Sequence, residues 1–265
     1  MRKILYALVI LTLFSCEEVV DVELETSAPR LVVEASLLFN ADTESDLQII
    51  KLSTTAPYFE EEIPAVSGAM VKVTTGSGEE YIFKETGGGI YENSEIVAKP
   101  DVNYQLEIVY ENELYTATAQ FTSTPKLQFV EQDLGGFSGD EYEFKIFYED
   151  PEETENFYLF RYLNDQVYLQ IYTDEFTNGN QTFAFFNDED ASPGDLVQFE
   201  IQGISEGFYE YLFILRSQSG DNNGGPFQTQ PSIVRGNIVN QTNPDNFPFG
   251  YFRLSEVNIL NYEVE

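Results

Sequence analysis

Hydrophobic and polar residues alternate along much of the chain, in short runs that are separated by turn-forming residues. Because successive side chains of a strand point to opposite faces, such runs predict strands with one buried face. In the first half, the pattern predicts strands near residues 31–37, 47–54, 69–75, 81–84, 104–110 and 114–121. Strands that recur about every 8–12 residues are typical of sandwiches, so we expect an immunoglobulin-like β-sandwich over residues 30–124.

Thr124-Pro125 marks the expected start of a second domain, residues 125–265. Strand-like runs return there, near residues 127–130, 142–148, 156–163, 166–173, 196–201 and 250–257. Residues 220–246 are rich in glycine, asparagine, proline and glutamine, which predicts a long loop before the last strand. The chain is therefore expected to be mainly β, with a second β-rich domain at its C-terminal end.

One segment of the second domain has a helical period. Its apolar stripe consists of Ile204, Phe208, Leu212 and Leu215. This spacing places the side chains on one face of a helix, and Ser205 can cap the first turn. We predict one helix near residues 205–218. The alternative is a strand that carries Tyr209, Tyr211 and Phe213.

The first residues have the pattern of a bacterial lipoprotein leader. Arg2-Lys3 precedes an apolar run that is shorter than the roughly 20 residues needed to span a bilayer. Leu13-Phe14-Ser15-Cys16 resembles a lipobox, with Phe14 in place of the usual small residue. We predict a signal peptide over residues 1–15, a lipidated Cys16 that carries acyl chains such as palmitate, and a tether over residues 16–29.

Glu17 and Glu18 follow the cysteine directly. They resemble the acidic signal that sends lipoproteins of Bacteroidetes-type bacteria to the cell surface. The expected location is therefore the outer membrane, with the protein facing the cell exterior.

Composition narrows the range of functions. The chain has 13 basic and 46 acidic residues, a formal charge of −33. Such a surface would repel nucleic acids and anionic lipid headgroups, which leaves the acyl chains as the expected means of membrane attachment. The chain has no histidine and one cysteine, so it lacks the usual neutral-pH base and the commonest ligands of transition metals.

Several short motifs resemble the DUF4249 family of Bacteroidetes lipoproteins. In chain order they are Pro29-Arg30-Leu31-Val32-Val33-Glu34, Ala56-Pro57-Tyr58-Phe59, Val66-Ser67-Gly68-Ala69, Ser192-Pro193-Gly194-Asp195, Tyr209-Glu210-Tyr211-Leu212, Pro226-Phe227, Gly236-Asn237-Ile238 and Gly250-Tyr251-Phe252. The resemblance covers nearly the whole chain and implies a cell-envelope lipoprotein that is commonly encoded beside TonB-dependent outer-membrane receptors. It implies no catalytic residues.

One acidic segment is a candidate metal site. Asp188, Glu189 and Asp190, with Asp195 nearby, could supply oxygen ligands to calcium. Their order does not follow an EF-hand loop, and the glycine that such a loop needs at its sharp turn is missing. The alternative is a solvated acidic loop.

Three phenylalanines are candidate partner contacts. Phe227, Phe247 and Phe249 lie in loop-like sequence rich in asparagine, glycine and proline. Loops on a rigid scaffold often carry binding residues, although the same side chains could instead fill the core.

We expect a non-catalytic protein without a cofactor apart from the lipid on Cys16. Paired carboxylates can hydrolyse glycosides without histidine, but no pair stands out among the 46 acidic residues. The expected function is that of an accessory subunit of a TonB-dependent receptor or related outer-membrane β-barrel complex. The alternative is a surface module that binds a glycan or another nutrient.

Overall fold

The computed structural model describes residues 27–40, 42, 47–60, 62–135, 141–152, 154–219 and 232–265. The prediction of a mainly β chain with a helix is confirmed. The elements are β1 Leu31–Asn40, β2 Gln48–Thr54, β3 Met70–Thr75, β4 Glu80–Gly87, β5 Ile90–Asn93, β6 Asn103–Tyr110, β7 Glu113–Thr122, β8 Leu127–Gly135, β9 Glu141–Glu149, β10 Phe157–Leu163, β11 Val167–Thr173, β12 Gln181–Asp188, β13 Leu196–Ile204, α2 Glu206–Ser219, β14 Val239–Asn240 and β15 Phe249–Glu263.

The first lobe is a barrel-like ring of strands. Going round it, the order is β15, β1, β2, β5, β4, β3, β6 and β7, and β7 then pairs with β15 again. The closing contact is short and parallel, and pairs Leu254 with Phe121 and Ser255 with Thr122. The predicted N-terminal immunoglobulin-like sandwich is therefore not confirmed. Alternation predicts which face of a strand is buried, but it does not reveal that the closing strand comes from the C-terminal end of the chain.

The inside of this ring is the first hydrophobic core. Each strand turns alternate side chains inward, among them Val33, Leu52, Val73 and Leu106. Phe252 and Leu254 of β15 are buried in the same core. The first lobe therefore combines residues 31–122 with the beginning of the last strand.

The second lobe is a sandwich of two sheets. One sheet has the order β12-β9-β8, and the other has the order β11-β10-β13-β15. The first, second and fifth strands of the lobe thus face the third, fourth, sixth and seventh, an arrangement typical of immunoglobulin-like sandwiches. The core between the sheets is rich in aromatic rings, including Phe144, Tyr162, Phe186 and Phe199.

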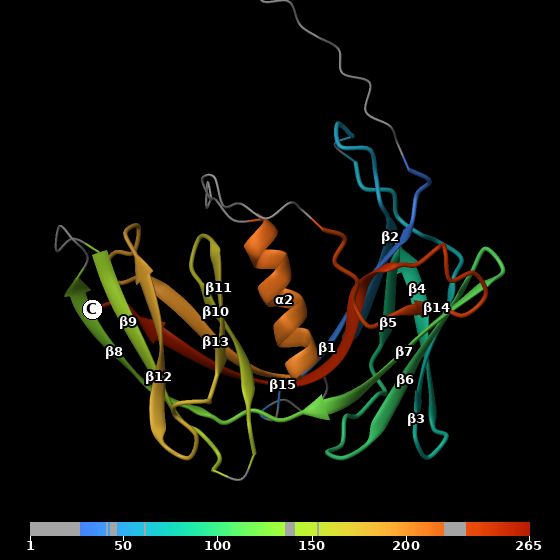
Figure 1. Cartoon of the computed structure of the whole chain (residues 1–265). Helices are drawn as coiled ribbons and strands as arrows, with labels where there is room; N and C mark the ends of the chain where they lie inside the picture. Colours follow the sequence, from blue (N-terminus) through green and yellow to red (C-terminus); the bar gives the residue numbers. More distant parts are fainter. Residues whose placement is uncertain are drawn as a thin grey trace, which may run out of the picture.

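The strand β15 joins the two lobes. Its first part pairs in parallel with β1, from Phe249 to Val257, and its last part pairs antiparallel with β13, from Val257 to Glu263. Figure 1 shows β15 running from one lobe into the other beneath α2, which stands between the lobes. The expected domain boundary near residue 124 falls in the connection between β7 and β8, but β15 belongs to both sides of it.

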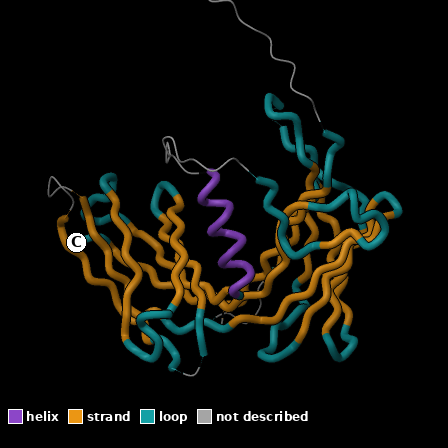
Figure 2. The backbone as a smooth tube through the Cα atoms, viewed as in Figure 1, coloured by secondary structure: helices purple, strands orange, loops and turns teal. Residues whose placement is uncertain are grey.

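The helix α2 lies in the region where a helix was predicted. Ser205 caps it, since the backbone N–H of Phe208 donates to Ser205 Oγ at 3.3 Å. Phe208 packs with Leu159 and Ile204 in a third, smaller core on the outer face of the sandwich. Figure 2 shows this helix surrounded by strands on both sides. Among the described residues, no helix is both long and apolar enough to cross a membrane.

Candidate functional site between the two lobes

A pocket of about 560 Å³ lies where β7 and β15 separate. Phe252 and Leu254 face the barrel core, so the alternate residues Tyr251, Arg253 and Ser255 face outward into this region. The polar residues Thr118, Gln120 and Thr122 line the pocket from β7.

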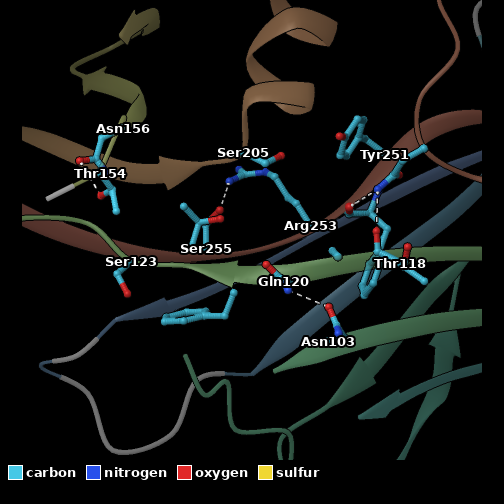
Figure 3. Close-up of a pocket in the computed structure, with 15 residues that line it drawn as sticks. Asn103, Thr118, Gln120, Ser123, Thr154, Asn156, Ser205, Tyr251, Arg253 and Ser255 are labelled. Atoms are coloured by element: carbon cyan, nitrogen blue, oxygen red, sulfur yellow. Dashed lines mark hydrogen bonds between the residues drawn. The ribbon is translucent and has the colours of Figure 1, made fainter. Parts of the chain in front are cut away.

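Both lobes contribute to the lining. Thr154 and Asn156 precede β10 in the second lobe, and Ser205 precedes α2. Figure 3 shows Thr154 and Asn156 on one side of the pocket, with Asn103, Thr118 and Gln120 on the other. Because β15 continues through both lobes, the two sides of the pocket are connected by one strand.

Arg253 is the only lysine, arginine, aspartate or glutamate among the residues that line this pocket. Its side chain is almost fully buried, with the residue 7% exposed. Three of its five N–H donors bond to uncharged oxygens: Nε to Ser36 Oγ at 3.0 Å, Nη1 to Ser255 Oγ at 2.6 Å and Nη2 to Gln202 Oε1 at 2.7 Å. Its guanidinium carbon also lies 4.5 Å from the centre of the Phe208 ring.

No carboxylate of the described chain lies within ion-pair distance of Arg253. The nearest link to one is indirect, because Gln202 accepts from Arg253 and donates to Glu200 Oε2 at 3.2 Å. Glu200 already forms an ion pair with Arg161 at 2.8 Å. This buried network therefore contains two arginines and one glutamate.

Burial, followed by repulsion from the nearby charge of Arg161, lowers the pKa of Arg253 to about 10. The group thus remains a cation at neutral pH. Taking an unpaired cation out of water costs several kcal/mol, so a buried one in a pocket is a candidate for a functional role.

The other described residues that line the pocket are uncharged. Burial raises the pKa of Tyr251, so its phenol is neutral at pH 7, and a hydrogen bond with Ser205 only partly offsets this. The first turn of α2 starts at Ser205, where a helix carries a partial positive charge. Among the residues that the structure describes, no acidic one lines the pocket, although the chain contains 46.

A second feature lies in the connection between β2 and β3. Tyr58 is 86% exposed, Phe59 is 75% exposed and Ile63 is 65% exposed. The two rings contact each other edge to face, with their centres 5.2 Å apart. Arg30 and Thr55 fix the base of this connection, through bonds of 3.0 Å and 2.9 Å. Figure 1 shows the connection projecting at the end of the molecule where the described chain begins.

Residues 17–258 match the family described as "Domain of unknown function (DUF4249)". The chain belongs to the DUF4249 family. No curated protein matches it.

Three solved structures share weak similarity with this DUF4249 chain. The FN1-FN3 domains of chicken CNTN1 are 14% identical, with a TM-score of 0.21, and the match covers 61% of this chain and 59% of that one. A DUF4785 family protein of Legionella pneumophila is 12% identical, with a TM-score of 0.23 and coverage of 68% and 54%. The chicken interferon gamma receptor alpha chain is 11% identical, with a TM-score of 0.20 and coverage of 68% and 90%. The chain thus spans less than two thirds of the first two.

The predicted anchor residues Cys16, Glu17 and Glu18 lie outside the described part of this DUF4249 chain, as does Phe227. Lipidation, surface export and a contact through Phe227 remain predictions.

Phe247 and Phe249 are half-buried and contact each other, with ring centres 5.5 Å apart. Two guanidinium groups stack on the Phe247 ring, from Arg30 at 3.8 Å and from Arg235 at 3.5 Å. Arg30 also donates to the backbone carbonyls of Asp245 and Phe247. These contacts fasten the segment before β15 to the start of β1, a structural use of Phe247 that leaves part of its ring accessible.

The four candidate calcium ligands do not lie in equivalent surroundings. Asp188 is buried, whereas Glu189 and Asp190 are exposed and Asp195 is half-buried. Asp188 and Asp190 line a pocket of about 390 Å³ together with Asp165. Within the described residues, no three His, Cys, Asp or Glu side chains are arranged to hold a metal ion.

Asp188 already has protein partners. Its Oδ2 accepts from the Tyr162 hydroxyl at 2.6 Å and from Asn164 Nδ2 at 2.9 Å, and its Oδ1 accepts from the Asp190 N–H at 2.9 Å. Burial alone would raise the pKa of Asp188, but these hydrogen bonds outweigh burial and lower it. Asp195 Oδ2 accepts from the Ser192 N–H at 2.8 Å, which stabilises the turn before β13.

Sequence reasoning did not identify the pocket or the exposed aromatic connection. Arg253 lies in a predicted strand, but alternation alone does not reveal that β7 diverges from that strand and leaves its outer face open. Tyr58 and Phe59 belonged to a family-like motif, and two adjacent aromatics after a proline were the available signal.

Proposed function

We propose that this DUF4249 chain is a lipid-anchored surface protein of the outer membrane that serves as a non-catalytic subunit of an outer-membrane β-barrel complex, with a TonB-dependent receptor as the partner class. The observation that carries this proposal is the exposed group Tyr58, Phe59 and Ile63, here called the aromatic loop. Large exposed apolar groups that cluster on one connection mark contact surfaces more often than isolated ones do.

The place of the aromatic loop fits a membrane-bound partner. Ser27 lies eleven positions after Cys16, so an anchor on Cys16 would hold the start of the described chain within about 40 Å of the membrane. The aromatic loop projects at that same end (Figure 1). Aromatic side chains are enriched among the residues that dominate protein interfaces, which supports Tyr58 and Phe59 as partner contacts.

Purification from native membranes in a gentle detergent tests the proposal. We expect a β-barrel protein to co-purify with the full chain, and we expect its recovery to fall at least about tenfold when Tyr58 and Phe59 are both replaced by serine, a loss of about 1.4 kcal/mol or more. Phe176→Ser is the matched control, because Phe176 is 90% exposed but belongs to the second lobe. Recovery of the wild-type chain alone would overturn the proposal.

The anchor has its own test. Cys16→Ala is expected to move the protein from the membrane fraction to the soluble fraction, because the acyl chains are then lost. Replacing Glu17 and Glu18 with alanine is expected to keep the protein in the membrane but protect it from protease added to whole cells. A membrane-bound Cys16→Ala variant would contradict lipid anchoring.

The pocket between the lobes favours a second candidate function, which is binding of a glycan or another small nutrient. Its volume of about 560 Å³ falls in the range of about 300–1,000 Å³ that small-molecule sites occupy. This function is compatible with the first, because the pocket and the aromatic loop are separate surfaces.

A further inference from the structure

We propose that the pocket between β7 and β15 binds a small hydroxylated carboxylate, of the class of sugar acids, and that Arg253 recognises the carboxylate group. The proposal rests on the second candidate function, binding of a small nutrient in this pocket, and does not depend on the membrane anchor or on the aromatic loop. It starts from a buried arginine that lines a pocket and that has no carboxylate partner in the described part of the chain.

The charge of the pocket selects an anion. Glu200 is matched by Arg161, and Arg253 reaches Glu200 only through Gln202, so one positive charge in the network has no counter-charge from the residues described. Three N–H donors of Arg253 are used by Ser36, Ser255 and Gln202, which leaves two for a ligand. A ligand carboxylate would supply the missing negative charge.

The single arginine favours a carboxylate over a phosphate. A guanidinium matches the two oxygens of a carboxylate, and one positive charge balances one negative charge. A phosphate monoester carries nearly two negative charges at neutral pH, and the remaining charge would be repelled by a chain with a net charge of −33.

The remaining lining favours a ligand with several hydroxyl groups. Side-chain amides and hydroxyls of Gln120, Thr122, Thr154 and Asn156 can both donate and accept hydrogen bonds. The neutral phenol of Tyr251 and the ring of Phe121 offer flatter, less polar surface, which suits the apolar face of a sugar ring. This mixture recognises a polyol more readily than a plain fatty acid.

Calorimetry on the full chain in detergent tests the ligand class, with D-glucuronate as the probe and D-glucose as its neutral counterpart. We expect saturable binding of glucuronate and at least about tenfold weaker binding of glucose, equivalent to about 1.4 kcal/mol. Equal affinity for both sugars would overturn the role of the charge. No binding at about 10 mM glucuronate, or tighter binding of glucose 6-phosphate, would overturn the ligand class.

Two variants test the site. Arg253→Gln is expected to weaken glucuronate binding at least about tenfold, because the charge is lost. Thr122→Asp places a carboxylate in the lining beside Ser255, its pairing partner on β15, and it is expected to weaken glucuronate binding because the protein then supplies the missing negative charge itself. Arg216→Gln removes one positive charge from the exposed end of α2 and should leave binding unchanged. If both pocket variants fold, as judged by circular dichroism, and bind as the wild type does, the proposal is wrong.

Discussion

The first lobe fills its core mainly with aliphatic side chains, whereas the second lobe fills its core largely with aromatic rings. Valine, leucine and isoleucine provide most of the buried residues of the barrel-like ring. In the sandwich, the Phe199 ring has four neighbouring rings whose centres lie within 6.5 Å of its own. They are the rings of Phe144, Tyr162, Phe186 and Tyr262. Each core also buries three tyrosines, whose hydroxyls need hydrogen-bond partners. They are Tyr91, Tyr104 and Tyr115 in the first core, and Tyr148, Tyr158 and Tyr162 in the second.

The lobes satisfy those hydroxyls in partly different ways. The first lobe uses two backbone carbonyls, of Val66 and Val97, and the half-buried carboxylate of Glu113, which accepts from Tyr115 at 2.6 Å, whereas the second lobe uses two buried carboxylates. In the first lobe, Tyr91 donates to the backbone carbonyl of Val66 at 3.0 Å. This bond holds the connection between β2 and β3 against the barrel-like ring of strands. In the second lobe, Tyr158 and Tyr162 donate to the carboxylates of Asp150 and Asp188, both at 2.6 Å. Hydrogen bonds to charged acceptors are shorter and stronger than those between neutral groups.

This difference explains part of the acidic composition. Asp150 and Asp188 are buried, with exposures of 3%. They serve the aromatic core from its two edges, so these acids cannot be counted as solvated surface charge. The comparison predicts that ring loss and hydroxyl loss affect the two lobes differently, and that the two edges of the aromatic core respond differently to pH.

The largest effect is expected for Phe199→Ala. The ring is fully buried at the centre of the aromatic core, and large-to-small changes of this type cost about 3–5 kcal/mol. Leu106→Ala, at a fully buried position of the first core, is the matched change in the other lobe and should cost about 2–5 kcal/mol. Urea unfolding of each variant measures these losses.

Because β15 belongs to both lobes, we expect each variant to shift one shared unfolding transition. If Phe199→Ala instead separates an early transition of the sandwich from a later one of the ring, the lobes are independent and the joint role of β15 is smaller than inferred.

A smaller effect is expected for Tyr162→Phe, which removes only the hydroxyl that donates to Asp188. A buried carboxylate loses a partner, so we expect a loss of about 1.5–3 kcal/mol in the free energy of unfolding. Tyr91→Phe makes the same chemical change in the first lobe, where the acceptor is a neutral carbonyl, and should cost about 0.5–1.5 kcal/mol. Equal losses would contradict the distinction between a buried carboxylate and a backbone carbonyl as the acceptor of a buried tyrosine hydroxyl.

The sequence predicts strand and helix positions better than it predicts their partners. The strand predicted near 31–37 is β1, and the helix predicted near 205–218 is α2, because both follow from local periodicity. The closure of the first lobe by β15 depends on a contact between residues more than 120 positions apart, which no local pattern encodes. The alternating hydrophobic pattern of a strand is the same in sandwiches and in barrels, so the sequence led to a sandwich where the first lobe is a barrel-like ring.

The candidate site was harder to predict than the fold. Asp188 appeared in the sequence as part of an acidic loop, but it is the last residue of β12, a strand that the pattern did not reveal. Asp188 accepts a hydrogen bond from Tyr162, which is 26 residues away in the sequence. Arg253 likewise has hydrogen-bond partners that are distant in the sequence, namely Ser36 of β1 and Gln202 of β13.

The smallest expected effect is a change in the pH dependence of stability, and it separates the two buried aspartates. Burial raises the pKa of Asp150, and the nearby carboxylate of Asp174 adds to this, whereas hydrogen bonds from Tyr158 and Gly179 act against it. The pKa of Asp188 is lowered, because its hydrogen bonds outweigh burial. The two groups therefore contribute to stability with opposite signs of pH dependence.

Asp188 stabilises the fold above the ordinary aspartate pKa of about 3.9, and its contribution is lost as the pH falls through its lowered value. Asp150 contributes fully below about 3.9, and its contribution is lost as the pH rises through its raised value. The difference in melting temperature between the wild type and Asp188→Asn should therefore shrink as the pH falls. The difference between the wild type and Asp150→Asn should grow. Melting curves between about pH 3 and pH 6 measure both trends. Parallel trends would show that burial, and not the set of hydrogen bonds, governs both carboxylates.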